Sequence, residues 1–267
     1  MSEISIIGLG WLGLPLAQFL IAQGQSVVGS VTTQEKAKTL TTQLPNLSVF
    51  VWNANRSETI PHELFASTTI ITLPPGKVDD YAPTLIRVIQ QAKQSGVQHL
   101  IYISSTSVYG GTGVCDETIL VNPETKQAEQ LIQVENALQT TGFPVFHIIR
   151  PSGLFGPGRY PARFMSGKQC SGGGRKVNLV HQQDIVRVIS ILLNASTSGI
   201  YNLASPSHPS RADFYTQACH QAGKAPPIFT DMADDGKVIR ADQIEIDTTF
   251  RYEVRDLMDW LTQSEPE

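Results

Sequence analysis

Three glycines near the start of the chain have the type and spacing that a bound pyrophosphate requires. Gly8, Gly10 and Gly13 follow the apolar run 4–7 in the pattern G-x-G-x-x-G, and a helical pattern comes next. Gly8 allows a tight turn, Gly10 lets the backbone approach a phosphate, and Gly13 lets the helix pack closely on the strand. The free N–H groups at the helix N-terminus favour an anion. We expect the cofactor to contact Gly8, Gly10, Trp11, Leu12 and Gly13.

The residues around the three glycines favour a phosphate-binding turn over the alternative, a turn in which the glycines have only a structural role. An apolar strand precedes them, and the helix predicted at 12–23 ends at Gly24, a common helix-terminating residue. Pro15 falls in the first turn of that helix, where a missing N–H is tolerated. Motif and context together predict a dinucleotide site.

The residues after the second predicted strand, 27–30, bear on the choice of dinucleotide. NAD-binding folds place an acid there on the ribose 2′-OH, but residues 29–33 contain no carboxylate, which favours NADP over NAD. Ser30, Thr32 and Thr33 can donate to a 2′-phosphate. No arginine stands there, and Lys36 and Lys38 are only nearby cations. A polar loop with a helix cap explains the same residues, so both cofactors remain open.

Two further strands end in residues that we place at the cofactor. The third predicted strand, 47–53, ends in Asn53, which we expect beside the adenine. The fourth, 69–73, leads into Leu73, Pro74 and Pro75, a rigid turn expected to pass close to the cofactor. Ligands of such sheets bind outside the carboxyl ends of the strands.

These residues must be positioned by alternating strands and helices, a pattern that predicts an α/β fold with a parallel sheet covered on both faces. Further predicted strands are 99–104, 145–150 and 199–203, and further predicted helices are 34–43, 81–95, 124–140 and one that begins near Asp184. The order of these elements predicts a Rossmann doubly wound sheet with a small C-terminal substrate lobe.

Composition narrows the function classes. The chain has 267 residues, 41% of them hydrophobic, and a net charge of -4, which gives no general attraction for nucleic acid or an anionic membrane. We see no signal-peptide pattern and no apolar run of the roughly 20 residues that span a bilayer, so we expect a cytoplasmic protein. The three cysteines are scattered, which predicts neither a metal site nor a redox pair.

Three segments resemble the NAD(P)-dependent epimerase/dehydratase family, the extended branch of the short-chain dehydrogenase/reductases. They are ISSTSVYG at 103–110, IRPSGLFGPGR at 149–159 and NLVHQQD at 178–184, followed by YEVRDL at 252–257. The segments occur in the family's order and cover nearly the whole chain. Proteins of this fold commonly dimerise through two helices of the Rossmann domain, which makes a homodimer one arrangement open to this chain.

The resemblance implies hydride transfer in which a tyrosine, four residues before a lysine, exchanges a proton. The upstream serine that positions the substrate oxygen matches Ser105; Ser104 is then expected at the cofactor and Thr106 at the substrate. Glu135 matches a family glutamate, and counting back from it puts Gln127 at the tyrosine position and Leu131 at the lysine position. This chain therefore resembles an atypical member that lacks the Tyr-x-x-x-Lys pair.

The missing pair matters because a positioned acid/base contributes roughly 10²–10⁴ in rate. Tyr109 is the candidate substitute that the family places on the cofactor side, with a purely structural role as its alternative. Lys126 adjoins the vacated position but lies about 100° away around a helix. His181 is read as a residue that orients the helix near Asp184.

The substrate side is marked by cations. Segment 156–177 contains five basic residues and no acid, and we expect Arg159 and Arg163 to bind a carboxylate or phosphate of the substrate. A solvated loop is the alternative. The short segment 204–267 favours a small substrate, with Arg240 and loop 204–209 lining its site if the family arrangement holds.

The expected Rossmann domain comprises residues 1–155 plus 178–203, and the expected substrate lobe comprises 156–177 plus 204–267. Two functions remain open. One is an NADP-preferring oxidoreductase or epimerase-like enzyme for a small anionic metabolite. The other is an NAD(P)-binding sensor or regulatory protein without turnover. The intact glycine motif and Ser105 favour the enzyme, whereas Gln127 and Leu131 favour the sensor.

Overall fold

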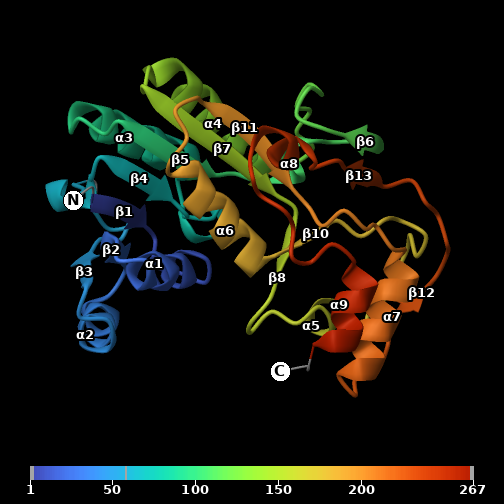
Figure 1. Cartoon of the computed structure of the whole chain (residues 1–267). Helices are drawn as coiled ribbons and strands as arrows, with labels where there is room; N and C mark the ends of the chain where they lie inside the picture. The colour runs from blue at the N-terminus through green and yellow to red at the C-terminus, as the bar shows by residue number, and fades with distance from the viewer. Residues whose placement is uncertain (1–2, 58, 265–267) are drawn as a thin grey trace. The chain divides into compact units, whose positions relative to one another are not determined.

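The structure, a computed structural model, describes residues 3–57 and 59–264. The outermost ends of the expected domains, residues 1–2 and 265–267, lie outside the described range. The chain divides into two compact units, coloured by residue number in Figure 1. Unit 1 comprises Met1–Val108, Thr125–Ile149 and Val188–Ile200; unit 2 comprises Tyr109–Glu124, Arg150–Arg187 and Tyr201–Glu267.

A seven-stranded sheet organises unit 1, in the order β11-β7-β5-β4-β1-β2-β3 (Figure 1). The strands are β1 (Glu3–Ile7), β2 (Ser26–Val31), β3 (Leu47–Val51), β4 (Thr68–Ile71), β5 (His99–Ile103), β7 (Val145–Pro151) and β11 (Gly199–Leu203). The pairs from β3 through β7 are parallel. The order reverses between β1 and β4, and in such sheets the ligand crevice lies at this switch point. The predicted Rossmann-like α/β fold is confirmed.

Four helices of unit 1 cover this sheet: α1 (Gly13–Ala22), α2 (Gln34–Gln43), α3 (Tyr81–Gln94) and α4 (Lys126–Thr141). Helices α3 and α4 pack side by side, while α1 packs on β1 and β2 (Figure 1). Helix α4 begins two residues later than predicted because Thr125 is its N-cap, with the hydroxyl accepting from the Ala128 N–H at 3.2 Å. Strand β3 ends before Asn53 because the Asn53 side chain accepts from the Asn55 N–H and starts a turn.

Two histidines form a buried pair in the sheet of unit 1. The Nε2 of His99 on β5 lies 2.8 Å from the Nδ1 of His147 on β7. Burial lowers the pKa of His99 to about 4 and the pKa of His147 to about 4. Both imidazoles are therefore neutral in the folded protein at neutral pH.

This pair predicts a loss of stability in mild acid. A histidine in the unfolded chain has a pKa near 6.5, so the unfolded state binds more protons between about pH 6.5 and pH 4. Stability therefore falls as pH falls through that window, by about 2 kcal/mol for each imidazole between pH 7.5 and pH 5. Urea unfolding at the two pH values measures the loss, and NMR titration assigns it. Titration of His99 or His147 near pH 6.5 would contradict the assignment of two neutral, buried imidazoles.

Unit 2 is built on three short parallel strand pairs. Strand β6 (Gly113–Cys115) pairs with β13 (Lys237–Ile239), β8 (Gly153–Phe155) with β10 (Leu179–His181), and β9 (Gln169–Cys170) with β12 (Ile228–Phe229). These pairings explain why the units differ from the expected domains. Residues 109–124, 150–155, 178–187 and 201–203 were expected in the Rossmann domain and fall instead in unit 2.

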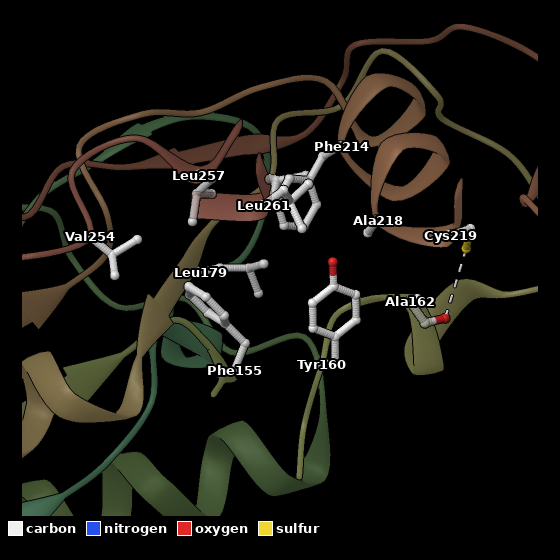
Figure 2. Close-up of a cluster of buried hydrophobic side chains, with 11 residues drawn as sticks. Phe155, Tyr160, Ala162, Leu179, Phe214, Ala218, Cys219, Val254, Leu257 and Leu261 are labelled. Carbon is white, nitrogen blue, oxygen red and sulfur yellow. Dashed lines mark hydrogen bonds between the residues drawn. The ribbon is translucent and has the colours of Figure 1, made fainter. Parts of the chain in front are cut away.

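The core of unit 2 is an apolar cluster drawn in Figure 2. Phe155 meets side chains from α7 (Arg211–Gln221), among them Phe214, and from α9 (Leu257–Gln263), among them Leu257. The Phe155 ring packs edge-on against Trp260 at 4.7 Å between centroids. The cluster includes Phe155 from the family-like segment 149–159, and Val254 and Leu257 from segment 252–257, and so gives these three residues a structural role.

A buried carboxylate fixes the start of the C-terminal segment of unit 2. Asp184 on α6 (Gln182–Leu192) accepts from the backbone N–H groups of Glu253 and Val254 and pairs with Arg187 at 3.4 Å. The Nδ1 of His181 lies 3.3 Å from the Gln183 N–H in the first turn of α6. This contact supports the interpretation that His181 orients the helix, which stays a prediction.

Candidate functional site

The turn after β1 is held from two neighbouring strands of unit 1. The Gly8 N–H donates to the Ser30 hydroxyl at 2.9 Å, and the Leu9 N–H donates to the Ser30 carbonyl at 2.8 Å. From β4, the Thr72 hydroxyl donates to the Gly8 carbonyl at 2.6 Å. Gly8 itself has φ +109°, a conformation that residues with a side chain rarely adopt. Buried Ser30, expected at the cofactor, therefore has a positioning role beneath the turn.

The other two glycines of the motif differ in what surrounds them. A methyl group on Gly13 would lie 2.2 Å from the Gly8 carbonyl oxygen, so helix and turn touch through backbone alone. A methyl group on Gly10 would have no described atom within 4 Å, and Gly10 is exposed. Gly13 thus serves close packing, while Gly10 presents bare backbone to open space. This is the arrangement a pyrophosphate needs.

The N-terminus of α1 adjoins that open face. Its N-cap residue is Leu12, and among the described residues no side chain caps the helix or adds an acid to its first turn. The helix N-terminus therefore retains its positive electrostatic character. Trp11, which precedes it, is half-buried. Backbone N–H groups at such a helix end can hold a phosphate.

The residues after β2 lie at the beginning of α2. Thr32 and Thr33 are exposed, and the Thr33 hydroxyl caps α2 by accepting from the Lys36 N–H at 3.3 Å. The Lys36 ammonium reaches back and donates to the Leu9 carbonyl at 2.8 Å. From the sequence, Lys36 was predicted only to be a nearby cation. Its position three residues after the N-cap residue Thr33 was the one sequence feature that could have indicated its place at the start of α2.

A buried hydroxyl network supports the turn after β4. The Tyr81 hydroxyl donates to the Leu73 carbonyl at 2.9 Å and lies 2.9 Å from the Tyr102 hydroxyl. Tyr102 is also hydrogen-bonded to Ser104, which donates to the Glu135 carboxylate. Burial raises the pKa of Tyr81 and of Tyr102, so both stay protonated. The network anchors Leu73. Ser104, which was expected at the cofactor, is instead hydrogen-bonded to buried Glu135. The role of Tyr81 in this network was not predicted from the sequence.

The other residues expected at the cofactor follow the strands. Asn53 and Leu73 are half-buried, Pro74 is exposed, and Pro75 begins a short 3-10 turn, Pro75–Lys77. Asn53 accepts from the Asn55 N–H at 3.0 Å. The structure therefore places Asn53 two residues beyond the end of β3, although it was expected as the last residue of that strand, and it places the Pro74–Pro75 turn after the end of β4.

Ser105 follows β5 in unit 1, at the end of the strand where ligands of such sheets bind. It is half-buried, and its hydroxyl accepts from the Ser107 N–H at 3.1 Å. Thr106 is buried in a short 3-10 turn that packs on α4. On α4, Gln127 is exposed and Leu131 is buried. The positions that the family resemblance assigns to a catalytic tyrosine and lysine thus hold an amide and an aliphatic side chain.

Tyr109, the candidate acid/base, is buried in unit 2. Its hydroxyl accepts from the Arg150 guanidinium at 2.7 Å and donates to the Asn202 amide oxygen at 3.0 Å. Burial raises the pKa of Tyr109, although Arg150 opposes the rise. The Asn202 backbone N–H in turn donates to Glu117 at 2.7 Å. These contacts give Tyr109 a part in linking segments of unit 2, and its role as an acid/base stays a prediction.

The cationic segment of unit 2 is partly neutralised. Arg175 pairs with Asp235 at 2.6 Å and Lys176 with Asp234 at 3.5 Å. Arg159 is half-buried, and desolvation together with the neighbouring charge of Arg163 lowers the pKa of its guanidinium. The Arg163 guanidinium donates to the Gly158 carbonyl. Two like charges held close together create a positive potential suited to an anion.

Other site types lack a candidate in the part of the chain that the structure describes. Within residues 3–57 and 59–264, no three His, Cys, Asp or Glu side chains group as metal ligands. Over the same residues, no helix has the length and apolar character needed to cross a bilayer.

Comparison with known proteins identifies the relatives of the chain. Protein YeeZ of Escherichia coli strain K12 is 35% identical over 269 residues, covering 96% of this chain and 97% of that protein. Two solved structures share the fold at low identity. The UDP-Glc/GlcNAc 4-epimerase of Campylobacter jejuni has a TM-score of 0.81 at 15% identity, covering 99% of this chain and 100% of that one.

The second is UDP-glucuronic acid 4-epimerase from Bacillus cereus, solved in complex with NAD, with a TM-score of 0.78 at 18% identity; the match covers 97% of this chain and 94% of that one. Residues 8–195 match the family described as NAD(P)H-binding, and this stretch begins at the first glycine of the turn and includes strands β2, β3, β4, β5 and β7 of the sheet. The chain belongs to the NAD(P)H-binding family.

Proposed function

We propose that this protein is an NADP-preferring oxidoreductase or epimerase/dehydratase-like enzyme that acts on a small anionic metabolite. The proposal that the protein binds a dinucleotide rests on one observation, the exposed backbone of Gly10. Its backbone faces open space, while Ser30 and Thr72 hold the turn around it. The open space at Gly10 leaves its backbone free for close approach of a pyrophosphate.

The residues that would hold the cofactor all belong to unit 1. Gly10 and the N-terminus of α1 would bind the pyrophosphate, and Thr32 and Thr33 would face the adenosine ribose. Asn53 would lie by the adenine and the Leu73–Pro75 turn near the rest of the dinucleotide. When bound, a nicotinamide supplies hydride transfer. The absence of a carboxylate from residues 29–33 supports NADP.

On the substrate side, we place the Ser105 hydroxyl on the reacting oxygen of the substrate. That hydroxyl already accepts the Ser107 N–H, an interaction that fixes its position and leaves its own proton to donate. Thr106 would border the same position. Within unit 2, Arg159 and Arg163 would bind an anionic group, which would relieve the mutual repulsion of the two guanidinium charges. Tyr109 stays our candidate acid/base, and its contacts with Arg150 and Asn202 give the alternative, a structural role.

Ser105 provides the test of the enzymatic reading. We expect Ser105→Ala to lower kcat/KM about 100-fold, the effect typical of losing one positioned hydrogen-bond donor, with NADPH affinity unchanged. Ser107→Ala is the matched control, because only the backbone of exposed Ser107 contacts Ser105. NADPH oxidation is followed at 340 nm with small carboxylated or phosphorylated carbonyl compounds. A substrate on which both variants retain full activity would contradict the role of Ser105.

A second function, a dinucleotide-binding sensor without turnover, is favoured by one observation on α4. Exposed Gln127 and buried Leu131 supply no proton exchange at the positions where the resemblance expects it. NADPH binding without oxidation by any carbonyl compound of the panel would support the sensor and contradict the enzyme.

A further inference from the structure

A buried pair of tyrosines in unit 1 joins the segments that follow β4 and β5. Tyr81 is the first residue of α3, Tyr102 lies on β5, and neither is exposed to solvent. Their hydroxyl oxygens are 2.9 Å apart, and the Tyr81 hydroxyl donates to the Leu73 carbonyl at 2.9 Å. Tyr102 is also hydrogen-bonded to Ser104, the residue before Ser105. One buried chain of hydroxyl groups therefore connects the turn after β4 with the segment after β5.

The hydroxyl protons of the two tyrosines point toward Leu73. Burial raises the pKa of Tyr81 and of Tyr102, so each phenol carries one proton to donate. The Leu73 carbonyl can only accept, and it takes the Tyr81 proton. The Tyr102 hydroxyl therefore donates to the Tyr81 oxygen. Because both phenols are fully buried, removal of one hydroxyl leaves its partner without a replacement from solvent.

The turn after β4 depends on its carbonyl groups. Pro74 and Pro75 carry no backbone N–H, so this part of the turn can be anchored only through carbonyls. Tyr81 binds the carbonyl of Leu73, the residue immediately before Pro74. The end of β4 has a separate anchor, because the Thr72 N–H and hydroxyl both donate to carbonyls of residues 7 and 8. Loss of the Tyr81 hydroxyl is therefore expected to loosen the turn and to leave the strand in place.

The order of the sheet indicates which part of a dinucleotide this turn faces. Strands β2 and β3 lie on one side of β1, and β4 and β5 lie on the other. The proposed site puts the pyrophosphate at the turn after β1 and the adenosine beyond β2 and β3. The nicotinamide half would therefore lie beyond the ends of β4 and β5, next to Leu73 and Ser105.

We infer that Tyr81 is a positioning residue for the nicotinamide half of the cofactor, and that Tyr102 ties its position to the Ser105 segment. The Tyr81 hydroxyl sets the direction of the Leu73 carbonyl and with it the path of the Pro74–Pro75 turn. This inference rests on the proposed cofactor site and adds two buried residues that act on that site through the turn. A purely structural pair would stabilise the fold and would affect every ligand equally or not at all.

Two ligands separate a positioning role from a structural one. NADPH and ADP share the adenosine and two phosphates, but only NADPH carries the nicotinamide. Calorimetry on Tyr81→Phe is expected to show an NADPH affinity about 10-fold below that of the wild type, the effect of one lost hydrogen bond, and an ADP affinity within about twofold of it. Tyr102→Phe keeps the bond between Tyr81 and Leu73, so we expect a smaller loss of NADPH affinity.

Thr69→Val is the matched control. It keeps the shape of the side chain and removes a buried hydroxyl that donates to the Ala66 carbonyl at 3.2 Å, near the start of β4 rather than after its end. Thermal melts check that each variant is folded. Thr69→Val is expected to lower the melting temperature, as Tyr81→Phe does, and to change neither affinity.

Three results would overturn the positioning role. They are an equal loss of NADPH and ADP affinity in Tyr81→Phe, no loss of either, and a larger loss of NADPH affinity in Tyr102→Phe than in Tyr81→Phe. A loss of NADPH affinity in Thr69→Val that matches the loss in Tyr81→Phe would assign the effect to lower stability and would also overturn the role. Failure of the wild-type protein to bind either ligand would contradict the proposed cofactor site itself, and the inference with it.

Discussion

Gly10→Ala is expected to give a folded protein that has lost at least about 100-fold of its affinity for NADPH. The methyl group would occupy the open space that Gly10 faces, and so would separate the backbone from a pyrophosphate. Two lost hydrogen bonds to a charged group, at roughly 1.5–3 kcal/mol each, account for a change of this size. The φ angle of Gly10 is not in the left-handed region, so alanine brings no backbone strain.

The measurement for Gly10→Ala is a fluorescence titration with NADPH beside a thermal melt. No described atom lies within 4 Å of the added methyl, so we expect the melting temperature to stay within about 2 °C of the wild type, the range of a change below roughly 0.5 kcal/mol. Retained affinity in a folded Gly10→Ala protein would mean that the pyrophosphate does not approach this face.

Gly13→Ala is expected to fail differently, by destabilising the fold. Its methyl group would lie 2.2 Å from the Gly8 carbonyl oxygen and 3.0 Å from the Thr72 hydroxyl. The nearest atom is backbone, and the turn is held by Thr72, so the contact cannot be relieved by a side-chain rotation. We expect a loss of about 3 kcal/mol, at the upper end of the range for overpacked sites, and a melting temperature lower by roughly 10 °C.

Gly10→Ala is the natural control for Gly13→Ala, since the two substitutions add the same methyl group within one turn. Urea unfolding compares them directly. A Gly13→Ala protein as stable as Gly10→Ala would show that helix α1 and the Gly8 turn have room to separate, and would remove the packing role assigned to this glycine.

Much of the fold could be predicted because local patterns determine it. The apolar runs of the central strands are continuous, as expected for strands buried on both faces, and the boundaries of α2 (Gln34–Gln43) coincide with the prediction. The last residue of β3 and the first residue of α4 each differ by two from the prediction, because hydrogen bonds of the Asn53 and Thr125 side chains determine these boundaries. Such local competition is invisible to periodicity alone.

The cofactor turn was also predictable, since glycine spacing encodes backbone approach. What the glycine spacing could not show is which polar residues the fold itself uses. Ser30 was expected at a ligand, yet its hydroxyl accepts from Gly8, 22 residues earlier in the chain. Lys36 was set aside as a nearby cation, and only the folded chain brings its ammonium to Leu9.

The second unit was harder to predict because its pairings join distant segments. Strand β6 pairs with β13, and Arg175 meets Asp235 sixty residues away. No local pattern in 109–124 signals a partner at 237–239. For the same reason, segment 156–177 has only basic charged residues in the sequence, but two of them, Arg175 and Lys176, pair in the structure with acids from residues 234–235.

The central claim is that the turn of Gly8, Gly10 and Gly13 binds NADP, and its most direct test is a titration of the purified wild-type protein with NADPH and NADH. Nicotinamide fluorescence reports the binding of both. The account predicts saturable binding of NADPH, with NADH binding at least about 10-fold more weakly, as expected from the loss of one hydrogen-bonded charge interaction. Binding of neither nucleotide would contradict the claim, and preferential binding of NADH would contradict its NADP half.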